Sequence, residues 1–191
     1  MYDPKDMRIE AAKKLFTVDD YYRMAEAGIL GPEDRVELID GEIIEMSPIG
    51  GRHAGCVNAA VAAFTAAFGR KVVVSVQNPV RLTEYTEPQP DIVLLKPRKD
   101  SYRAKRVWGE DVLLVVEVAD TTLRYDRDVK LPHYAAAGVP EVWIEDLQHD
   151  VLLVYREPQG KSYKTIVTLK RKDSVAVLAF PDVVFKVADI I

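Results

Sequence analysis

The sequence predicts a mixed α/β fold, in which helices pack on a mixed β-sheet core and an added helix and β-hairpin precede that core. Short runs of branched residues alternate with segments whose apolar residues recur at helical spacing. Hydrophobic residues make up 48% of the 191, enough to bury roughly two thirds of the unfolded surface in one core. No linker rich in proline, glycine or serine divides the middle of the chain. We therefore expect one domain over residues 1–191, with 1–15 as a loose N-terminal segment.

The added N-terminal elements are predicted by local signals. The hydroxyl and the acids of Thr17–Asp20 can satisfy free N–H groups at the start of a helix, and Gly28 ends that helix. Two runs of branched residues, 36–39 and 43–46, then flank Asp40-Gly41. This pair is a signal for a tight hairpin, because its glycine accepts a positive φ.

Two more helices and the strands of the sheet follow. An alanine-rich segment, 52–68, carries apolar residues at helical spacing and predicts a buried helix. Another helix is expected from about Tyr125 to Ala137, closed by Gly138 and Pro140, although Pro132 is awkward inside it. Runs rich in branched residues predict strands at 72–82, 91–95, 112–118 and 141–146, a hairpin of 151–156 with 163–169, and one or two strands within 175–187.

Charge and cysteine content restrict the class of protein. A net charge of −4 argues against a protein that coats nucleic acid, although it does not exclude a nuclease. Local basic clusters at 96–106 and 170–172 fit either solvated loops or surfaces that face phosphate. The single cysteine, Cys56, cannot form an internal disulfide, which favours a reducing cytoplasm. No secretory signal or apolar run of the ~20 residues that a membrane span needs is visible, so we expect a cytoplasmic protein without a membrane partner.

Glu117 is the strongest indication of a functional site. It lies in the apolar run 113–119, where a strand buried on both faces should carry no charge. Burying an ionised acid costs several kcal/mol unless it is paired or bound to a cation. Either Glu117 belongs to a site, or an arginine pairs with it, or the end of the strand emerges into solvent.

Asp91 stands at the start of a second apolar strand, directly after Pro88-Gln89-Pro90. Taken alone, it fits a turn residue after proline equally well. Together, however, Asp91 and Glu117 are acids at the ends of two strands and could share one hard cation. Magnesium suits such a site, because it takes oxygen ligands and keeps several waters.

Lys130 is the basic candidate. Asp126 lies four residues before it and Tyr134 four after, so the three side chains share one face of the predicted helix. Taken alone, such a lysine is more often part of an exposed ion pair of little energy.

Other polar residues are weaker candidates. Glu37 fits either a further ligand or the polar face of a hairpin strand. His53, at the start of a helix, could contact phosphate or water or cap that helix, and Gln77 is a similar but weaker candidate. His133 and His149 have no ligand spacing with His53, so a zinc site is not expected.

Pro90-Asp91, followed by Glu117-Val118-Ala119, resembles the two-part acidic signature of the PD-(D/E)XK nuclease superfamily. The third position departs from that signature, because Ala119 stands where the superfamily has a lysine. More closely, the chain resembles the Uma-two family of inferred restriction endonucleases from about residue 15 to 189. The motifs that carry this resemblance are Glu37-Leu38-Ile39-Asp40-Gly41-Glu42-Ile43, His53, Pro90-Asp91-Ile92, Val116-Glu117-Val118, the Asp126/Lys130/Tyr134 spacing, and Gly138-Val139-Pro140-Glu141-Val142-Trp143.

The resemblance implies a restriction-endonuclease-like fold and hydrolysis of DNA phosphodiester bonds with magnesium or manganese. It implies Asp91, Glu117 and the backbone carbonyl of Val118 as metal ligands. The lysine role moves to Lys130 on the following helix, where the ammonium would orient a water and offset negative charge.

In the same scheme Glu37 binds or orients a second ion, and Gln77 steadies the lysine or the substrate. A homodimer would suit cleavage of both strands. Two alternatives stay open. Ala119 favours a non-catalytic protein of the nuclease fold that binds nucleic acid or a protein partner. A carboxylate-pair hydrolase that acts on sugars would need no metal.

Overall fold

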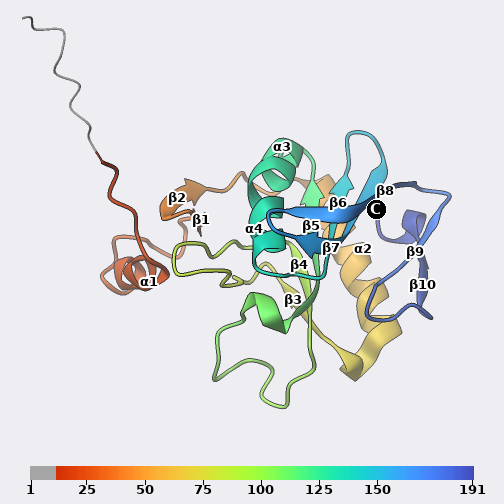
Figure 1. The fold of residues 1–191 in the computed structure, drawn as a ribbon, viewed down its shortest axis with the longest axis horizontal. Coiled ribbons are helices and arrows are strands. Elements are labelled where there is room, and N and C mark those ends of the chain that lie inside the picture. Colours follow the sequence, from red (N-terminus) through yellow and green to blue (C-terminus); the bar gives the residue numbers. More distant parts are fainter. Residues whose placement is uncertain (1–11) are drawn as a thin grey trace, which may run out of the picture.

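The computed structural model describes residues 12–191 and has a six-stranded mixed β-sheet at its centre (Figure 1). The loose segment expected over 1–15 therefore falls mostly outside the described residues. All neighbouring strands run antiparallel except β5 and β6, which are parallel. In spatial order the strands are β3 (Val73–Val76), β4 (Ile92–Leu95), β5 (Val112–Ala119), β6 (Glu141–Asp146), β7 (Val151–Gln159) and β8 (Ser162–Lys170). The predicted class, a mixed sheet flanked by helices, is confirmed.

Helices cover both faces of this sheet. On one face lies α2 (Gly51–Phe68), whose buried residues include Phe64, in a tilted contact with Trp143 of β6 at 5.9 Å between ring centroids. On the other face lies α4 (Leu131–Ala136), with Tyr134 and Ala135 packed against the sheet. Burying one such large apolar side chain contributes roughly 1.5–3 kcal/mol to folding. The central strands β4, β5 and β6 are consequently buried on both faces.

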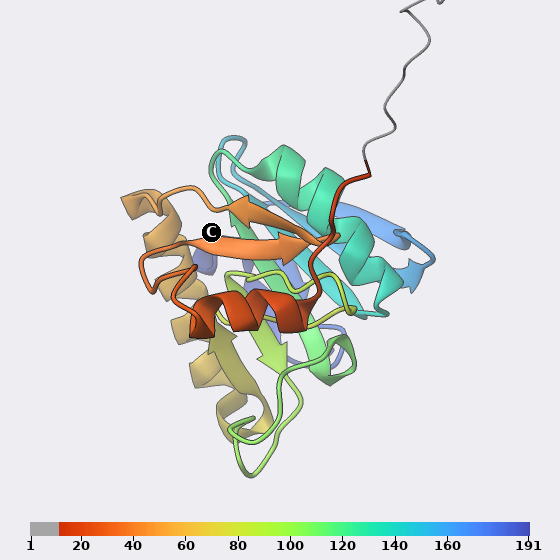
Figure 2. The same ribbon diagram turned by 90° about the vertical axis from the view of Figure 1, so that its left-hand side faces the viewer.

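The N-terminal elements form a separate unit beside the sheet (Figure 2). Helix α1 (Val18–Glu26) is capped by the hydroxyl of Thr17, as predicted, and the structure shows that this cap is reciprocal with the side chain of Asp20. Strands β1 (Val36–Ile39) and β2 (Glu42–Glu45) form their own two-stranded sheet. The turn between them is the predicted Asp40-Gly41 pair, with positive φ at both residues (50° and 75°).

Backbone contacts hold this hairpin against the loop that precedes β4. Leu38 forms an isolated bridge with Glu87, and the N–H of Gly41 donates to the carbonyl of Tyr85 at 2.7 Å. At the other end of the chain, β9 (Ser174–Ala176) and β10 (Val184–Lys186) form a small sheet that closes the core beside α2. In the described residues, no helix is long and apolar enough to cross a membrane.

Two predicted elements differ from the structure. The strand expected over 72–82 ends at Val76, because Gln77 has a φ of 50° and Pro79 cannot donate to a ladder. The single helix expected over 125–137 is divided into α3 (Leu123–Tyr125), a π-turn (Asp126–Lys130) and α4. Pro132 has no N–H for a regular helical bond, and the N–H of Leu131 just before it donates to the carbonyl of Asp126, five residues back.

Candidate active site

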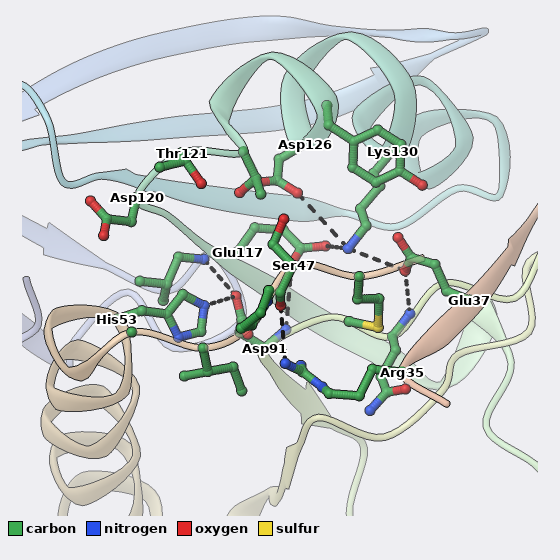
Figure 3. Close-up of a pocket in the computed structure, with 18 of the residues that line it drawn as sticks. Arg35, Glu37, Ser47, His53, Asp91, Glu117, Asp120, Thr121, Asp126 and Lys130 are labelled. Atoms are coloured by element: carbon green, nitrogen blue, oxygen red, sulfur yellow. Dashed lines mark hydrogen bonds and ion pairs between the residues drawn. The ribbon is translucent and has the colours of Figure 1, made fainter. Parts of the chain in front are cut away.

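A cavity of about 260 Å³ opens where β4 begins and β5 ends. These two ends lie together because the strands are antiparallel. The hairpin β1–β2, the first turn of α2 and the π-turn complete the walls (Figure 3). The charged and titratable side chains around it are Arg35, Glu37, Glu45, His53, Asp91, Glu117, Asp120, Tyr125, Asp126 and Lys130.

Asp91 and Glu117 lie on adjacent strands and line the same cavity. The β4–β5 ladder pairs Ile92 with Val116, so the next positions along the two strands are Asp91 and Glu117. The N–H of Asp91 donates to Oε2 of Glu117 at 3.4 Å, and the N–H of Val118 donates to Oδ2 of Asp91 at 2.9 Å. The two acids are thus brought together at one end of the sheet.

Lys130 is the buried partner of Glu117. Its Nζ lies 3.3 Å from Oε1 of Glu117, 3.3 Å from Oε2 of Glu37 and 3.8 Å from Oδ1 of Asp126. The lysine side chain is only 5% exposed, so its interpretation as a surface ion pair is wrong. The Oη of Tyr134, one turn further along the helix, donates to Oε1 of Glu117 at 2.6 Å. No arginine is needed to explain this acid, and the end of β5 does not emerge into solvent.

Glu37 also points inward. It is 2% exposed, and its Oε2 accepts a hydrogen bond from the N–H of Gln89 at 2.9 Å besides the ion pair with Lys130. The alternative placement on the polar face of a hairpin strand is therefore wrong. Through Glu37, the hairpin contributes a carboxylate to the site.

His53 and Gln77 both contact Asp91. Nε2 of His53 lies 3.0 Å from Oδ2 of Asp91, and Nε2 of Gln77 donates to Oδ1 at 3.4 Å. The hydrogen bond to Asp91 raises the pKa of His53, against the opposing effect of burial. His53 does not cap α2, which begins at Gly50 without a side-chain cap. Gln77 lies beside Asp91 but not among the residues that line the cavity.

The site holds more acids than bases. Burial raises the pKa of Glu117 to about 8, although the charge of Lys130 opposes that rise. Burial likewise raises the pKa of Asp126, again opposed by Lys130. Burial alone would lower the pKa of Lys130, but the carboxylates of Glu117, Glu37 and Asp126 outweigh it and raise that pKa above its ordinary range. Lys130 is therefore an ammonium at neutral pH, and one lysine does not balance four carboxyl groups, Asp91 included.

The donor atoms suit a hard divalent cation. Asp91 and Glu117 offer carboxylate oxygens, and Val118 also lines the cavity. Burial favours the protonated forms of Glu117 and Asp126, and a bound divalent cation would favour their ionised forms. Among residues 12–191, no group of three or more His, Cys, Asp or Glu side chains is arranged to hold a metal ion.

Arg35, Tyr125 and the segment 120–122 were not predicted from the sequence, yet they line the cavity. A signal for Arg35 was present, because residues two apart in a strand point to the same side and Arg35 precedes Glu37 by two. Residues 120–122 directly follow β5 and Tyr125 ends α3, and no pattern in the sequence singled them out.

Comparisons with known proteins bear on the family and the fold of the chain. The model of the Uma2 family, described as "Putative restriction endonuclease", matches residues 18–188. The chain is similar to the crystal structure of "a putative nuclease belonging to DUF820 from Anabaena variabilis ATCC 29413", with 17% sequence identity and a TM-score of 0.72 over 92% of this chain and 97% of that one. At this identity the likeness shows the fold. No curated protein matches the chain. Since the family match covers most of the sequence, the chain belongs to the Uma2 family.

Proposed function

We propose that this protein is a divalent-metal-dependent endonuclease that hydrolyses phosphodiester bonds in DNA. Its family, described as "Putative restriction endonuclease", supports a nuclease, and so does the fold. The observation that carries the proposal is the buried ammonium of Lys130, held between Glu117 and Glu37 at 3.3 Å from each in the cavity that Asp91 also lines.

Asp91, Glu117 and the backbone carbonyl of Val118 are the proposed ligands of magnesium or manganese. When bound, such a cation withdraws charge from a phosphate oxygen and makes a nearby water more acidic. The contacts of Asp91 support this assignment, because His53 and the N–H of Val118 hold its Oδ2 in place.

Lys130 takes the role that the superfamily assigns to a lysine two residues after the second acid. Position 119 is a buried alanine, so β5 itself supplies no cation there. Because its pKa is raised, Lys130 keeps its proton and does not act as the base. Its ammonium instead orients the attacking water and offsets the negative charge that develops on the phosphate.

Glu37 and Gln77 are positioning residues in this scheme. Glu37 shares Lys130 with Glu117, which fixes the direction of the ammonium. Gln77 contacts Asp91 and not Lys130, so it steadies the first acid and not the lysine. We further propose a homodimer, since two sites related by a two-fold axis suit a duplex.

A cleavage screen tests the proposal. Supercoiled plasmids, with and without modified bases, are incubated with the wild-type protein in magnesium, in manganese or in EDTA. We expect nicked and linear products with either metal and none in EDTA or with Glu117→Gln. The exposed Asp182→Asn is the matched control, because it removes a carboxylate outside the site.

Two outcomes would contradict the proposal. Cleavage that persists in EDTA excludes a metal-dependent centre and favours a carboxylate-pair hydrolase mechanism. No cleavage under any condition, together with no effect of metal on the melting temperature, leaves the non-catalytic interpretation, which Ala119 favours.

A further inference from the structure

Arg35 is a cation at the cavity, and within residues 12–191 it forms no ion pair with a carboxylate. In the part of the chain that the structure describes, its one side-chain bond runs from Nη1 to the carbonyl of Ser47 at 3.0 Å. Lys130, the other cation of the cavity with a fixed charge, already faces three carboxylates. Arg35 is therefore the cation still available to an anion that enters the cavity.

The hairpin fixes the position of Arg35. The N–H of Met46 donates to the carbonyl of Arg35 at 2.8 Å, and the bond to Ser47 holds the side chain across the strand ends. Figure 3 shows the side chain extending toward Ser47 and Asp91. Arg35 thus lies on the Asp91 side of the cavity.

The chemistry of the guanidinium matches a phosphate. Arginine carries five N–H donors in a planar fork and stays charged, so it can give two parallel hydrogen bonds to phosphate oxygens. Among the described residues only Nη1 of Arg35 has a hydrogen-bond partner, which leaves the donors on Nε and Nη2 for a ligand. The other walls of the cavity are rich in carboxylates, including Glu45 and Asp120, which repel an anionic backbone.

We infer that Arg35 binds a backbone phosphate of the nucleic-acid substrate and so determines which part of the backbone lies beside Asp91. This inference rests on the proposed nuclease function, but it concerns binding and not the hydrolytic step. The substrate class is a phosphodiester chain, recognised through its phosphate and not through its bases.

Binding of a fluorescent DNA oligonucleotide, measured by anisotropy in EDTA so that metal-dependent cleavage is stopped, tests the inference. The variants are Arg35→Gln, which keeps N–H donors but no charge, and Arg35→Lys, which keeps the charge but no planar fork. Arg70→Ala is the matched control, since Arg70 is exposed in the segment that follows the far end of α2 and has no recorded ion pair. Melting temperatures of all variants establish that they are folded.

We expect Arg35→Gln to weaken binding about tenfold or more, because a charge-assisted bond is lost. The slope of log Kd against log salt should fall by about one unit, as for one phosphate contact. Arg35→Lys should restore the slope but only part of the affinity, and Arg70→Ala should change neither.

The inference is overturned if Arg35→Gln has the affinity and salt slope of wild type, or if the wild-type protein does not bind the oligonucleotide. Binding that depends on Arg35 in a protein that never cleaves DNA would support the inference while contradicting the proposed hydrolysis.

Discussion

At the scale of single residues, the ion cluster around Lys130 combines stability with chemistry. Its ammonium is buried and faces Glu37, Glu117 and Asp126. Removing one partner from a buried charge group typically costs about 3–5 kcal/mol, because the remaining charges lose their compensation. A cation bound by Asp91 and Glu117 would replace part of that compensation.

Lys130→Met should accordingly lower the free energy of unfolding and abolish cleavage. Loss of one stabilising donor in an active site costs about 10²–10³ in kcat. The rise in melting temperature caused by magnesium should persist, since lysine is not a ligand. Plasmid cleavage and thermal melts with and without magnesium measure both, with the exposed Lys172→Met as control. If Lys130→Met does not fold, Lys130→Arg keeps the charge and tests its placement. A Lys130 variant as active as wild type would contradict the role.

Glu87 gives a prediction on pH. It is 3% exposed, and its Oε2 has no hydrogen-bond partner among residues 12–191. Burial raises its pKa above the ordinary 4.5, while a bond with Tyr22 and the charges of Arg106 and Arg81 oppose the rise. The folded protein then holds a proton that the unfolded chain releases, so this contribution to stability is present below pH about 4.5 and is lost as pH rises through the raised value.

Glu87→Gln should remove the loss of stability that wild type suffers as pH rises. The variant should melt at a higher temperature than wild type at pH 8, and the difference should shrink as pH falls to 4. Melting curves across this range measure it, and the exposed Glu84→Gln in the same loop is the control. A difference that is independent of pH would contradict the assignment.

The sequence revealed some site residues better than others. Glu117 was found because a carboxylate in an apolar strand is physically costly, and its burial bears this out. Arg35 was not found, because its spacing from Glu37 becomes informative only once Glu37 is known to face the cavity and not solvent.

At the scale of elements, the turn of the β1–β2 hairpin is packed closely. Gly41 has a φ of 75°, and a Cβ added there would lie 2.7 Å from Cβ of Leu15 and 3.1 Å from the carbonyl oxygen of Phe16. Gly28 has a similar φ of 72° with nothing within 4 Å. Alanine substitution at Gly28 therefore introduces backbone strain alone, whereas alanine at Gly41 adds a steric clash to that strain.

Gly28→Ala should cost about 1–2 kcal/mol, the strain of a left-handed residue with a side chain. Gly41→Ala should cost more than that, and it should also reduce cleavage, because the hairpin carries Glu37. Denaturant unfolding and plasmid cleavage measure the two effects. Equal losses for the two variants would show that the contact with Leu15 contributes nothing.

The π-turn explains why the prediction of one helix over 125–137 was only partly right. The spacing of Asp126, Lys130 and Tyr134 indicated one shared face, and all three do lie against Glu117 or its partners. The division of the helix depends on hydrogen bonds around Pro132, which a periodic pattern does not encode.

At the scale of the whole molecule, metal binding should be visible as stability. A ligand that binds only the folded state adds about 2.7 kcal/mol at 100 times its Kd. We expect magnesium or manganese to raise the melting temperature, and Asp91→Asn to weaken that rise, while Asp182→Asn leaves it unchanged. Calorimetry over a metal titration measures it. No shift at millimolar metal would contradict the proposed ligands.

The architecture was predicted more completely than the site. Alternating strands and helices led to a mixed sheet, and the parallel pair within it, β5 and β6, is the one joined by a helical crossover. Asp91 and Glu117 could be placed together because each stands at the end of a strand. The resemblance to a family, and not the helix pattern alone, connected Lys130 with them.

The hairpin that carries Arg35 and Glu37 belongs to a different hydrogen-bonded sheet from Asp91 and Glu117. Within residues 12–191 its strands pair with the rest of the chain through one isolated bridge, from Leu38 to Glu87, and its turn adds a backbone bond from Gly41 to Tyr85. The opening that exposes the amide hydrogens of β1 and β2 to exchange should therefore cost less free energy than the opening that exposes those of β5 and β6. One such sub-global opening would release Glu37 from Lys130 and open the cavity on the hairpin side, so the access of a long polymer to the acids is linked to the local stability of this hairpin.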